Sequence, residues 1–571
     1  MKTSRLIWYV LAMLLAVFTY FYELGSPNIP KNGDEFPYTH ITRLTAASGH
    51  LLPLQSELDH MRNTKPPLLF WQGIASTHWG SAWSWWQLRY PSVIYTLLTA
   101  LLVFLLAKRL AQQQKIEGDA SPMETGFIAA LTFLAFFSTY RFGRPFLVNP
   151  AEVFWFFLPF CTLLYRRAFA FESPLFVPLL LGVEIGIGLL YKSFALVVPV
   201  GFALAWWYLH MRDYRLMAFL LKDSWKVALT VTVALAMFGL WFLFDPNPQA
   251  VWQEFVVGEN AGKFDPHGAG YFATLLWGGS SIWALLLGYP INAGLLAFPV
   301  AAVFLVAWRR RTLLSNAERM LWIWLFALFL VFSVPSQRSA RYLLEAMPAL
   351  AVLCALNWQR IGRPFFVASL LLSGAVLALL IFLSVRLQHE VGDLYSILYW
   401  LLLLLTGGLI LFGLFVARHT RMVMNGAALL VMLSLAAFLS PFDGAVGNFS
   451  AEAQRYAKGK EVWTPCNFRA VDEGYRFLLP GARVHGYMAV PSPSVAELSA
   501  NYGLFAVQLP LHQQCVGCRV VGQRLEIRGR HSPEEIRRIF SGEVFQQLFV
   551  QELLVEAPNA APAQPPKEGC R

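Results

Sequence analysis

Two adjacent carboxylates, Asp34 and Glu35, lie in a polar stretch that directly follows an apolar segment at residues 6–22. The apolar segment is long enough to cross a bilayer as a helix. A carboxylate just outside a membrane can act as a general base toward a hydroxyl or amine, or it can hold a divalent metal ion that neutralises phosphate. The pair therefore indicates chemistry on a membrane-held molecule, and stabilisation of a helix N-terminus is the structural alternative.

Basic side chains recur in the connections expected on the same membrane side as Asp34. They are Lys65, Arg141, Arg144, Lys192, Lys263, Arg338 and Arg341. Lys192 lies between two apolar segments with almost no loop, where an ionisable residue is costly and usually paired. The set predicts a pocket for an anionic headgroup, with Arg gripping phosphate bidentately and Lys acting as a point charge. Ion pairs with Glu152, Glu184 or Glu345 are the alternative.

The composition identifies a polytopic α-helical membrane protein rather than a soluble domain. Of 571 residues, 57% are hydrophobic and only 14% are charged, and the apolar residues come in blocks of about 20, the length of a spanning helix. We predict about thirteen transmembrane helices, near residues 6–23, 87–107, 124–140, 146–165, 175–190, 194–210, 227–244, 283–307, 319–334, 342–357, 365–386, 396–416 and 423–441. The net charge of +11 reflects basic loops that set topology, so we expect no nucleic-acid binding.

The orientation follows from these loops. Alternate connections carry paired Lys and Arg residues on the side of the N-terminus, which places the N-terminus in the cytoplasm. An odd number of spans then places the C-terminal domain outside, in the periplasm of a bacterial inner membrane. The first outer loop, residues 24–86, contains a Trp-rich stretch at 66–86. That stretch predicts an amphipathic helix on the membrane surface, with a short re-entrant span as the alternative.

We expect a transmembrane domain at residues 1–444 and a small C-terminal α/β domain at 445–571. Strand-like runs occur at 482–487, 504–510 and 518–528, the last with Gly522-Gln523 as a hairpin turn, and a helix starts at Ser532-Pro533. The tail at 557–571 has a disordered composition. In an oxidising compartment, a disulfide from Cys466 to Cys515 or Cys518 is expected.

Several short motifs follow one another along the chain. They are Gly33-Asp34-Glu35 with Tyr38, Ala47-Ser48-Gly49, Lys65-Pro66-Pro67, Arg144-Pro145 with Asn149-Pro150, the stretch from Gly188 to Ser193, Glu259-Asn260 with Gly262, and Arg341-Tyr342 before Pro348. In its motifs and in their order along the sequence, the chain resembles the GT-C glycosyltransferases that use polyprenyl-phosphate sugars. The resemblance is to the lipid A aminoarabinose transferases and the protein O-mannosyltransferase superfamily, and it is clearest over residues 1–360.

The resemblance implies roles for individual residues. Asp34 would be the catalytic base, Lys65 would grip the lipid phosphate, and Arg341 would line the same cavity. A second catalytic acid is expected at the fourth span, where this sequence has Asn149 and then Glu152 one turn later, so Glu152 is the candidate substitute. The remaining candidates are Glu35 as a catalytic acid and Tyr38, Arg141, Asn149, Lys192, Glu259, His267, Arg338 and Tyr342 as substrate-binding residues.

The aminoarabinose transferases hold zinc with a glutamate before the Lys-Pro turn and a downstream histidine. Here the glutamate position is Thr64, and His267 matches the histidine, so half of the pair is missing. We therefore do not assign a zinc site, and a divalent metal at the carboxylates remains open.

The resemblance implies direct transfer of a sugar, with inversion, from an undecaprenyl-phosphate or other polyprenyl-phosphate donor. Expected acceptors are lipid A or another glycolipid, a glycan, or a protein, so the partners are the donor lipid, that acceptor and the surrounding membrane lipids. A flippase for a lipid-linked sugar and a non-enzymatic scaffold are the alternatives. Transporters often consist of two related halves. No such internal duplication is apparent in this sequence.

Overall fold

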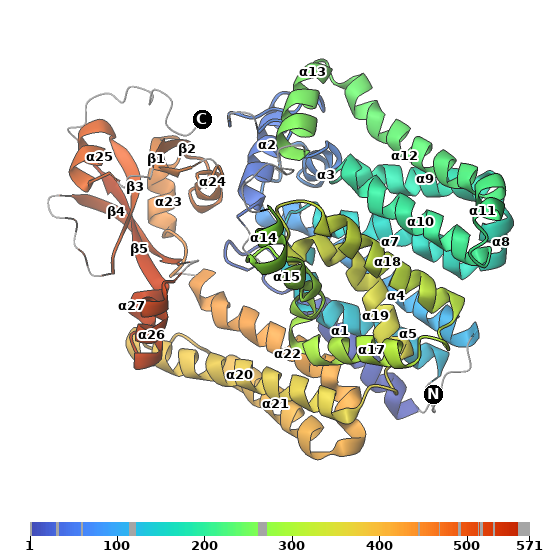
Figure 1. Cartoon of the computed structure of the whole chain (residues 1–571). Coiled ribbons are helices and arrows are strands. Elements are labelled where there is room, and N and C mark those ends of the chain that lie inside the picture. The colour runs from blue at the N-terminus through green and yellow to red at the C-terminus, as the bar shows by residue number, and fades with distance from the viewer. Residues whose placement is uncertain are drawn as a thin grey trace.

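The computed structural model describes the chain except for residues 1–2, 30–32, 59–60, 114–120, 261–270, 444–445, 468, 489–492, 512, 514, 516–517, 529–530 and 558–571. The predicted disordered tail therefore lies almost entirely outside the described residues. A large helical part is followed by a sheet domain near the C-terminus (Figure 1).

The helical part contains helices of very different lengths. They are α1 (Thr3–Phe21), α2 (Glu35–Ala47), α3 (Leu68–Ser76), α4 (Trp85–Gln113), α5 (Pro122–Ala135), α6 (Phe137–Gly143), α7 (Asn149–Tyr165), α8 (Arg167–Glu172), α9 (Phe176–Leu189), α10 (Val197–Met211), α11 (Leu216–Lys222), α12 (Ser224–Phe244), α13 (Pro248–Val251), α14 (Tyr271–Trp277), α15 (Ile282–Leu286), α16 (Gly288–Ala293), α17 (Ala297–Arg309), α18 (Asn316–Ser333), α19 (Met347–Leu356), α20 (Arg363–Val391), α21 (Ile397–Phe415) and α22 (Thr420–Leu439). Two further turns matter for the site, the 3₁₀ helix η5 (Ala340–Ala346) and the π-helix η2 (Trp252–Asn260).

Each of the thirteen predicted spans falls on one of these helices or on a run of them. Among the described residues, eight helices are long and apolar enough to cross a membrane, or nine if the bent pair α5–α6 counts as one span. Two shorter apolar helices, Arg5–Phe21 and Phe176–Leu189, add to them. The chain is thus a multi-pass membrane protein, and thirteen as the number of spans stays a prediction.

The interfacial helix expected at 66–86 is shorter than predicted. Helix α3 ends at Ser76, and the chain then turns through His78, Trp79 and Gly80, all with positive φ. Trp85 already belongs to α4. A positive φ is compatible with a turn but not with a continuing helix, which explains the early end.

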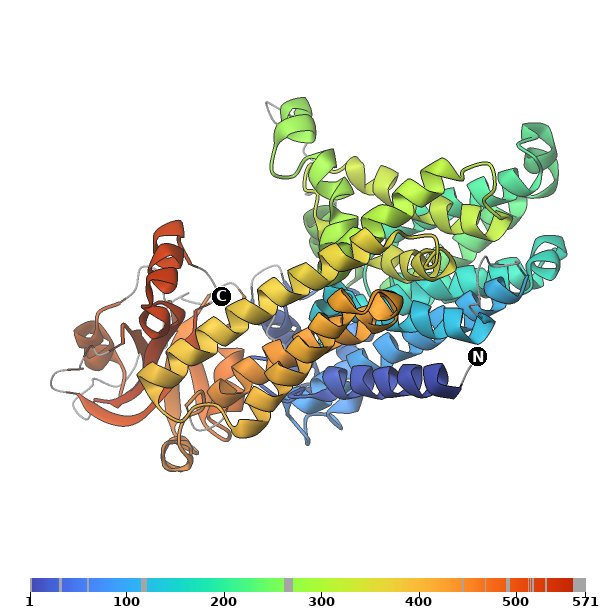
Figure 2. The same cartoon turned by 90° about the horizontal axis from the view of Figure 1, so that it is seen from below.

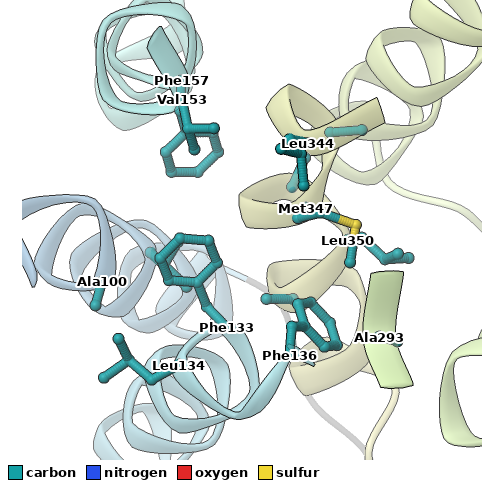
Figure 3. Packing of buried hydrophobic residues seen from close by; sticks show 14 of the residues in the cluster. Ala100, Phe133, Leu134, Phe136, Val153, Phe157, Ala293, Leu344, Met347 and Leu350 are labelled. Atoms are coloured by element: carbon teal, nitrogen blue, oxygen red, sulfur yellow. The ribbon is translucent and has the colours of Figure 1, made fainter. Parts of the chain in front are cut away.

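The interior of the membrane part is a continuous apolar core where α4, α5, α7 and α19 meet. Phe133 of α5 and Phe157 of α7 lie near Met347 and Leu350 of α19 in Figure 3. Phe136 lies at the break between α5 and α6, where the two helices bend by 63°. Val148, Ala151 and Val153, around the start of α7, belong to this core, so the core fixes the position of the polar residues that begin that helix.

The C-terminal domain is a five-stranded sheet with flanking helices. The strands β1 (Glu461–Cys466), β2 (Arg483–Met488), β3 (Leu504–Leu509), β4 (Arg519–Ile527) and β5 (Phe549–Glu556) lie in the order β2-β1-β3-β5-β4. Strand β1 is parallel to β2 and β3, whereas β5 is antiparallel to β3 and β4. The helices are α23 (Ala451–Ala457), α24 (Glu473–Leu478), α25 (Val495–Asn501), α26 (Pro533–Ser541) and α27 (Val544–Leu548).

The structure corrects two details of the predicted domain. Gly522-Gln523 is not a hairpin turn, because it lies inside β4 beside a register shift between Val520 and Gly522. Cys515 and Cys518 bond to each other, with a Cα–Cα distance of 5.5 Å, so neither pairs with Cys466. The predicted helix start is confirmed, since Ser532 caps α26 and accepts a hydrogen bond from the N–H of Glu535.

The C-terminal domain is docked on the membrane part through α24. Glu473 is fully buried and accepts hydrogen bonds from His40 Nδ1 at 2.7 Å and Arg43 Nε at 3.1 Å, both on α2. His40 Nε2 accepts the N–H of Glu57, so the ring hydrogen lies on Nδ1 and points at Glu473. Phe477 stacks on Trp85 at 4.1 Å between ring centroids. We call these contacts the α24 clamp.

The α24 clamp predicts an acid-sensitive docking. Burial alone would raise the pKa of Glu473, but the hydrogen bonds from His40 and Arg43 outweigh it and lower the pKa from 4.5 to about 2. Because the folded pKa is depressed, this stabilisation is complete above about pH 4.5 and is lost as the pH falls toward 2, a contribution of roughly 3 kcal/mol. The protection of the α24 amides from hydrogen exchange, expressed relative to their intrinsic exchange rates at each pH, should therefore fall between pH 4.5 and 3 in the native protein. Glu473→Gln should remove that pH dependence, and an unchanged profile in the variant would contradict the assignment.

Candidate active site

A polar cavity of about 920 Å³ lies where α2, the loop before α3, the start of α7 and η5 meet. We call it the polar cavity. Side chains from distant parts of the chain line it, including Asp34, Tyr38, Lys65, Lys192, Glu259, Arg341, Tyr342 and Arg469. Seven of these eight are residues that the sequence singles out. The polar cavity is therefore the candidate active site.

Asp34 and Arg341 meet in this cavity although they are 307 positions apart in the sequence. Arg341 Nη1 donates to Asp34 Oδ2 at 2.5 Å, and Arg341 Nη2 donates to Asn149 Oδ1 at 2.7 Å. The side chain of Asp34 is 41% exposed. The guanidinium is thus fixed from one side by an amide, while the carboxylate of Asp34 remains accessible from the cavity.

Lys65 occupies a second position of the same cavity and pairs with an acid of η2. Its Nζ donates to Glu259 Oε1 at 2.5 Å and to the carbonyl of Thr64 at 2.7 Å. Burial lowers the pKa of Lys65 and the neighbouring Lys192 lowers it further, only partly offset by Glu259. An anionic ligand would stabilise the charged ammonium at this position.

Lys192 confirms the ion-pair alternative drawn from the sequence. Its Nζ donates to Glu152 Oε2 at 2.8 Å, and Asn149 Nδ2 donates to the same oxygen at 3.0 Å. Glu152 is fully buried at the start of α7, and it lines the second cavity described below rather than the polar cavity. Asn149 therefore connects Arg341 to Glu152, and we infer that Glu152 orients these groups.

Local sequence places the cationic residues. Ser339 starts η5 and its hydroxyl accepts the N–H of Arg341 at 3.3 Å, so Arg341 is fixed at the first turn. Ser193 caps the turn after Lys192 in the same manner and donates to Asn260 Oδ1 at 2.8 Å. The two prolines after Lys65 directly precede α3, so α3 does not extend back to Lys65.

Five of the predicted site residues that the structure describes do not line the polar cavity: Asn149 and Glu152 contact its cations, whereas Glu35, Arg141 and Arg338 are held by other contacts. Glu35 is 1% exposed and pairs with the guanidinium of Arg89 at 2.8 and 2.9 Å. Arg141 is exposed and lies over the ring of Phe142, whereas Arg338 is buried and donates to the carbonyl groups of Ser333 and Ser280. His267 lies outside the described residues. Glu35 and Arg338 thus have structural contacts, because each satisfies buried partners.

A second, apolar cavity of about 1500 Å³ adjoins the first. It is lined mainly by Phe194, Leu196, Val198, Val256, Val331, Phe332 and Val334. Lys192 and Tyr342 line both cavities, and the ring of Tyr342 lies 5.3 Å from that of Phe332. Continuous polar and apolar cavities suit an amphiphile whose charged group lies at Lys192 and whose hydrocarbon lies beyond it.

Arg469 is a cavity residue that the sequence did not reveal. It comes from the loop after β1, and a side-chain carbon placed on Gly33 would lie 3.7 Å from its Nη1. The α24 clamp begins four positions later, at Glu473, and holds this loop against α2. A lone arginine in a polar region carries no signal in one sequence, because only the docking of the domain brings it beside Asp34.

Within the described ranges, no group of three or more His, Cys, Asp or Glu side chains could hold a metal ion. The carboxylates of the polar cavity, Asp34 and Glu259, each face a cation at 2.5 Å.

Comparison with known proteins agrees with this geometry. The model of the family Dolichyl-phosphate-mannose-protein mannosyltransferase matches residues 6–253. Two curated relatives are named undecaprenyl phosphate-alpha-4-amino-4-deoxy-L-arabinose arabinosyl transferase. The Edwardsiella ictaluri protein is 26% identical over 62% of this chain and 60% of its own length, and the Proteus mirabilis protein, transferase 2, is 24% identical over 64% and 62%. The chain thus spans about three fifths of the length of these relatives.

Solved structures extend the likeness to nearly the whole chain. The crystal structure of ArnT from Cupriavidus metallidurans bound to undecaprenyl phosphate has a TM-score of 0.59 at 16% identity, covering 97% of this chain and 99% of that one. The apo state of the same protein has a TM-score of 0.58. These matches show that the chain has the fold of ArnT, in agreement with the resemblance drawn from the motifs.

Proposed function

We propose that this protein is a membrane glycosyltransferase that moves a sugar from an undecaprenyl-phosphate donor to an acceptor on the periplasmic side of the bacterial inner membrane. The acceptor is lipid A or another glycolipid or glycan. One observation carries the proposal: Asp34, Lys65 and Arg341 converge on one polar cavity that continues into an apolar one. The names of the curated relatives point to the same class of donor.

The donor would bind across both cavities. Its hydrocarbon would enter the apolar cavity, and its phosphate would lie at the junction, near Lys192 and Tyr342. Lys65 and Arg341 are then the cations that stabilise the phosphate as the glycosidic bond breaks and negative charge develops on the leaving oxygen. The sugar would project into the polar cavity toward Asp34.

Asp34 would act on the acceptor. Its carboxylate accepts the proton of the acceptor nucleophile, the nucleophile forms a bond to the anomeric carbon, and the bond from that carbon to the phosphate oxygen breaks. The electron pair leaves with the lipid phosphate. Attack from the side opposite the leaving group inverts the anomeric configuration.

The proposed orientation has the N-terminus in the cytoplasm and the C-terminal domain in the periplasm. The basic loops of the sequence support it, because cytoplasmic connections carry the excess of Lys and Arg. The polar cavity would lie on the same side of the membrane as the C-terminal domain, because Arg469 of that domain lines it. A periplasmic cavity has direct access to acceptors of the cell envelope.

A divalent metal is a separate proposal. Asp34 and Glu259 are the carboxylates of the polar cavity that could bind such an ion, which would then assist departure of the phosphate. Turnover measured with and without EDTA decides between this arrangement and one that relies on Lys65 and Arg341 alone.

The direct test uses protein reconstituted in nanodiscs with undecaprenyl phosphate-linked 4-amino-4-deoxy-L-arabinose as donor and lipid A as acceptor. Mass spectrometry should show a glycosylated product and free undecaprenyl phosphate. In parallel, envelope lipids and glycans of cells with and without the gene identify the natural acceptor. A donor that is moved across the bilayer but never cleaved would contradict the proposal and favour a flippase.

Replacing Lys65 by methionine should weaken binding of undecaprenyl phosphate by about 10- to 150-fold, the loss of one charge-assisted hydrogen bond of about 1.5–3 kcal/mol. The substitution keeps the length and apolar stem of the side chain but leaves Glu259 facing the phosphate. Microscale thermophoresis with labelled lipid measures the change. Lys222→Met, at an exposed position at the end of α11, is the matched control and should bind as the native protein does. Equal affinity of both variants would exclude Lys65 from the phosphate site.

Arg469→Ala should raise the KM for a phosphate-bearing acceptor while leaving undecaprenyl phosphate binding unchanged. Arg469 lies beside Gly33 and lines the polar cavity but not the apolar one, so it would contact the acceptor rather than the lipid. The expected loss is about fivefold, because an exposed charge contributes on the order of 1 kcal/mol. Arg469→Lys should recover part of it. A loss of donor affinity instead would place Arg469 at the donor phosphate.

A protein acceptor is the second candidate. The matching family model describes transfer of mannose to proteins. Mass spectrometry of periplasmic proteins from cells with and without the gene distinguishes it from transfer to a glycolipid.

A further inference from the structure

Helix α26 carries an apolar side that remains exposed in the folded protein. Ile536 and Phe540 are 44% and 62% exposed, whereas Ile539 between them is buried. These three residues follow the i, i+3, i+4 spacing of one helix face. The opposite face is charged, with an ion pair from Arg538 to Glu534 at 3.1 Å. The helix is therefore amphipathic, and only part of its apolar face is used within the chain.

The end of α26 and the following helix α27 contact the membrane helix α20 (Figure 1). Phe540 stacks on Phe382 of α20, with ring centroids 6.4 Å apart and an interplanar angle of 20°. Just after α26, the N–H of Phe545 donates to Glu390 Oε2 at 3.3 Å. Ile539 belongs to the same apolar core cluster as the membrane helices. This part of the C-terminal domain is thus packed onto a transmembrane segment.

The sequence of α20 shows at which depth this contact lies. An uncharged run of 22 residues, 364–385, precedes Arg386. At 1.5 Å per residue the run spans about 33 Å, close to the thickness of the hydrocarbon core. Phe382 lies in the last turn of the run, next to Ile381 and Val385, which are 39% and 52% exposed. Phe540 therefore lies at the edge of the hydrocarbon. Figure 2 shows α20 extending as a long helix toward the sheet domain.

We propose that α26 binds the bilayer surface and anchors the C-terminal domain to the membrane beside α20. Ile536 and Phe540 enter the boundary between headgroups and acyl chains and extend the lipid-facing surface of α20. Arg386, whose guanidinium lies over Phe382 at 5.7 Å, and Arg537 face the headgroup layer and attract anionic lipids. This inference does not depend on the proposed activity. The domain is then attached at two places, the α24 clamp and the membrane surface.

Spin labelling tests the proposal. Ile536→Cys and Phe540→Cys carry a nitroxide on the apolar face, and Glu534→Cys and Arg538→Cys are matched controls on the charged face of the same helix. All four positions are exposed. Phe540→Cys removes the ring that stacks on Phe382, so Ile536→Cys is the variant that reports on the apolar face with this contact in place. The full chain is placed in nanodiscs of phosphatidylethanolamine and phosphatidylglycerol, and collisions with molecular oxygen and with a water-soluble nickel chelate are compared. The unsubstituted protein measures labelling of the native cysteines.

The labels at 536 and 540 should collide several-fold more with oxygen, and several-fold less with nickel, than the two controls. Equal nickel accessibility at all four positions would place α26 in water and overturn the proposal. Strong dipolar coupling between labels at 540, with both reagents excluded, would instead identify a second copy of the chain as the partner and also overturn it.

Discussion

Asp34→Asn is expected to lower turnover by about 10²–10⁴-fold, the usual contribution of a general base. The amide keeps the size of the carboxylate, and its carbonyl oxygen can still accept the hydrogen bond from Arg341 Nη1. It cannot accept the proton of the acceptor nucleophile. Product formation by the reconstituted enzyme measures the loss, and binding of undecaprenyl phosphate should be retained because Asp34 does not form the phosphate site.

Asp393→Asn is the matched control. Asp393 is exposed just after α20, and its carboxylate accepts a hydrogen bond from the side-chain amide of Gln388. It should turn over like the native protein. Full activity of Asp34→Asn would remove the base from the mechanism. Loss of both turnover and lipid binding would instead indicate that Asp34 serves mainly to hold Arg341 in place.

Arg89→Met should destabilise the protein by about 3–5 kcal/mol, the cost of leaving a buried carboxylate without its ion-pair partner. Arg89 and Glu35 are each 1% exposed and share two hydrogen bonds, and Glu35 also accepts the N–H of Phe146. Thermal unfolding in detergent, followed by loss of a sharp size-exclusion peak, measures the shift. Activity should fall as well, because Glu35 directly follows Asp34.

Combining Arg89→Met with Glu35→Leu should recover much of the stability, since replacing both members of a buried ion pair by apolar residues is often nearly neutral. Arg455→Met, on an exposed face of α23, should have little effect. A double variant as unstable as the single one would show that the hydrogen bonds of Arg89 to the carbonyls of Leu24 and Ser26 matter more than the ion pair.

The positions of the membrane helices were predictable because they depend on a local property of the sequence, the length of each apolar run. A spanning helix must be apolar over a fixed length, and apolar length can be read directly. The exact number of spans is harder to predict, since short helices such as α9 and α16 have no length signal of their own. Broken segments require the surrounding structure to be recognised.

The ionisable residues of the site were predictable as a set but not as pairs. Asp34, Lys65, Lys192 and Arg341 stand out because charge is costly next to apolar segments. Glu35 and Arg338 stand out for the same reason, yet they point into the protein and satisfy buried partners. The direction in which a side chain points is set by the fold, so one sequence does not separate a residue that lines a cavity from one that pairs inside the protein.

The strands missed in the C-terminal domain have specific causes. Strand β1 contains Pro465, which argues against a strand in the middle of a sheet. Strand β5 contains Gln551-Glu552-Leu553-Leu554, whose composition favours a helix. In the structure Glu552 is buried and accepts a hydrogen bond from Arg524, so tertiary contacts override the local preference.

The internal ion pairs of the resting cavity also bear on which molecules can occupy it. Arg341, Lys65 and Lys192 each face a carboxylate at 2.5, 2.5 and 2.8 Å. A small free anion, such as inorganic phosphate, would have to compete with these internal counter-ions and would gain little net attraction. A lipid brings hydrocarbon whose transfer from water supplies affinity of its own. The internal pairing of these three cations would therefore act as a filter that keeps abundant soluble phosphates out while admitting amphiphiles.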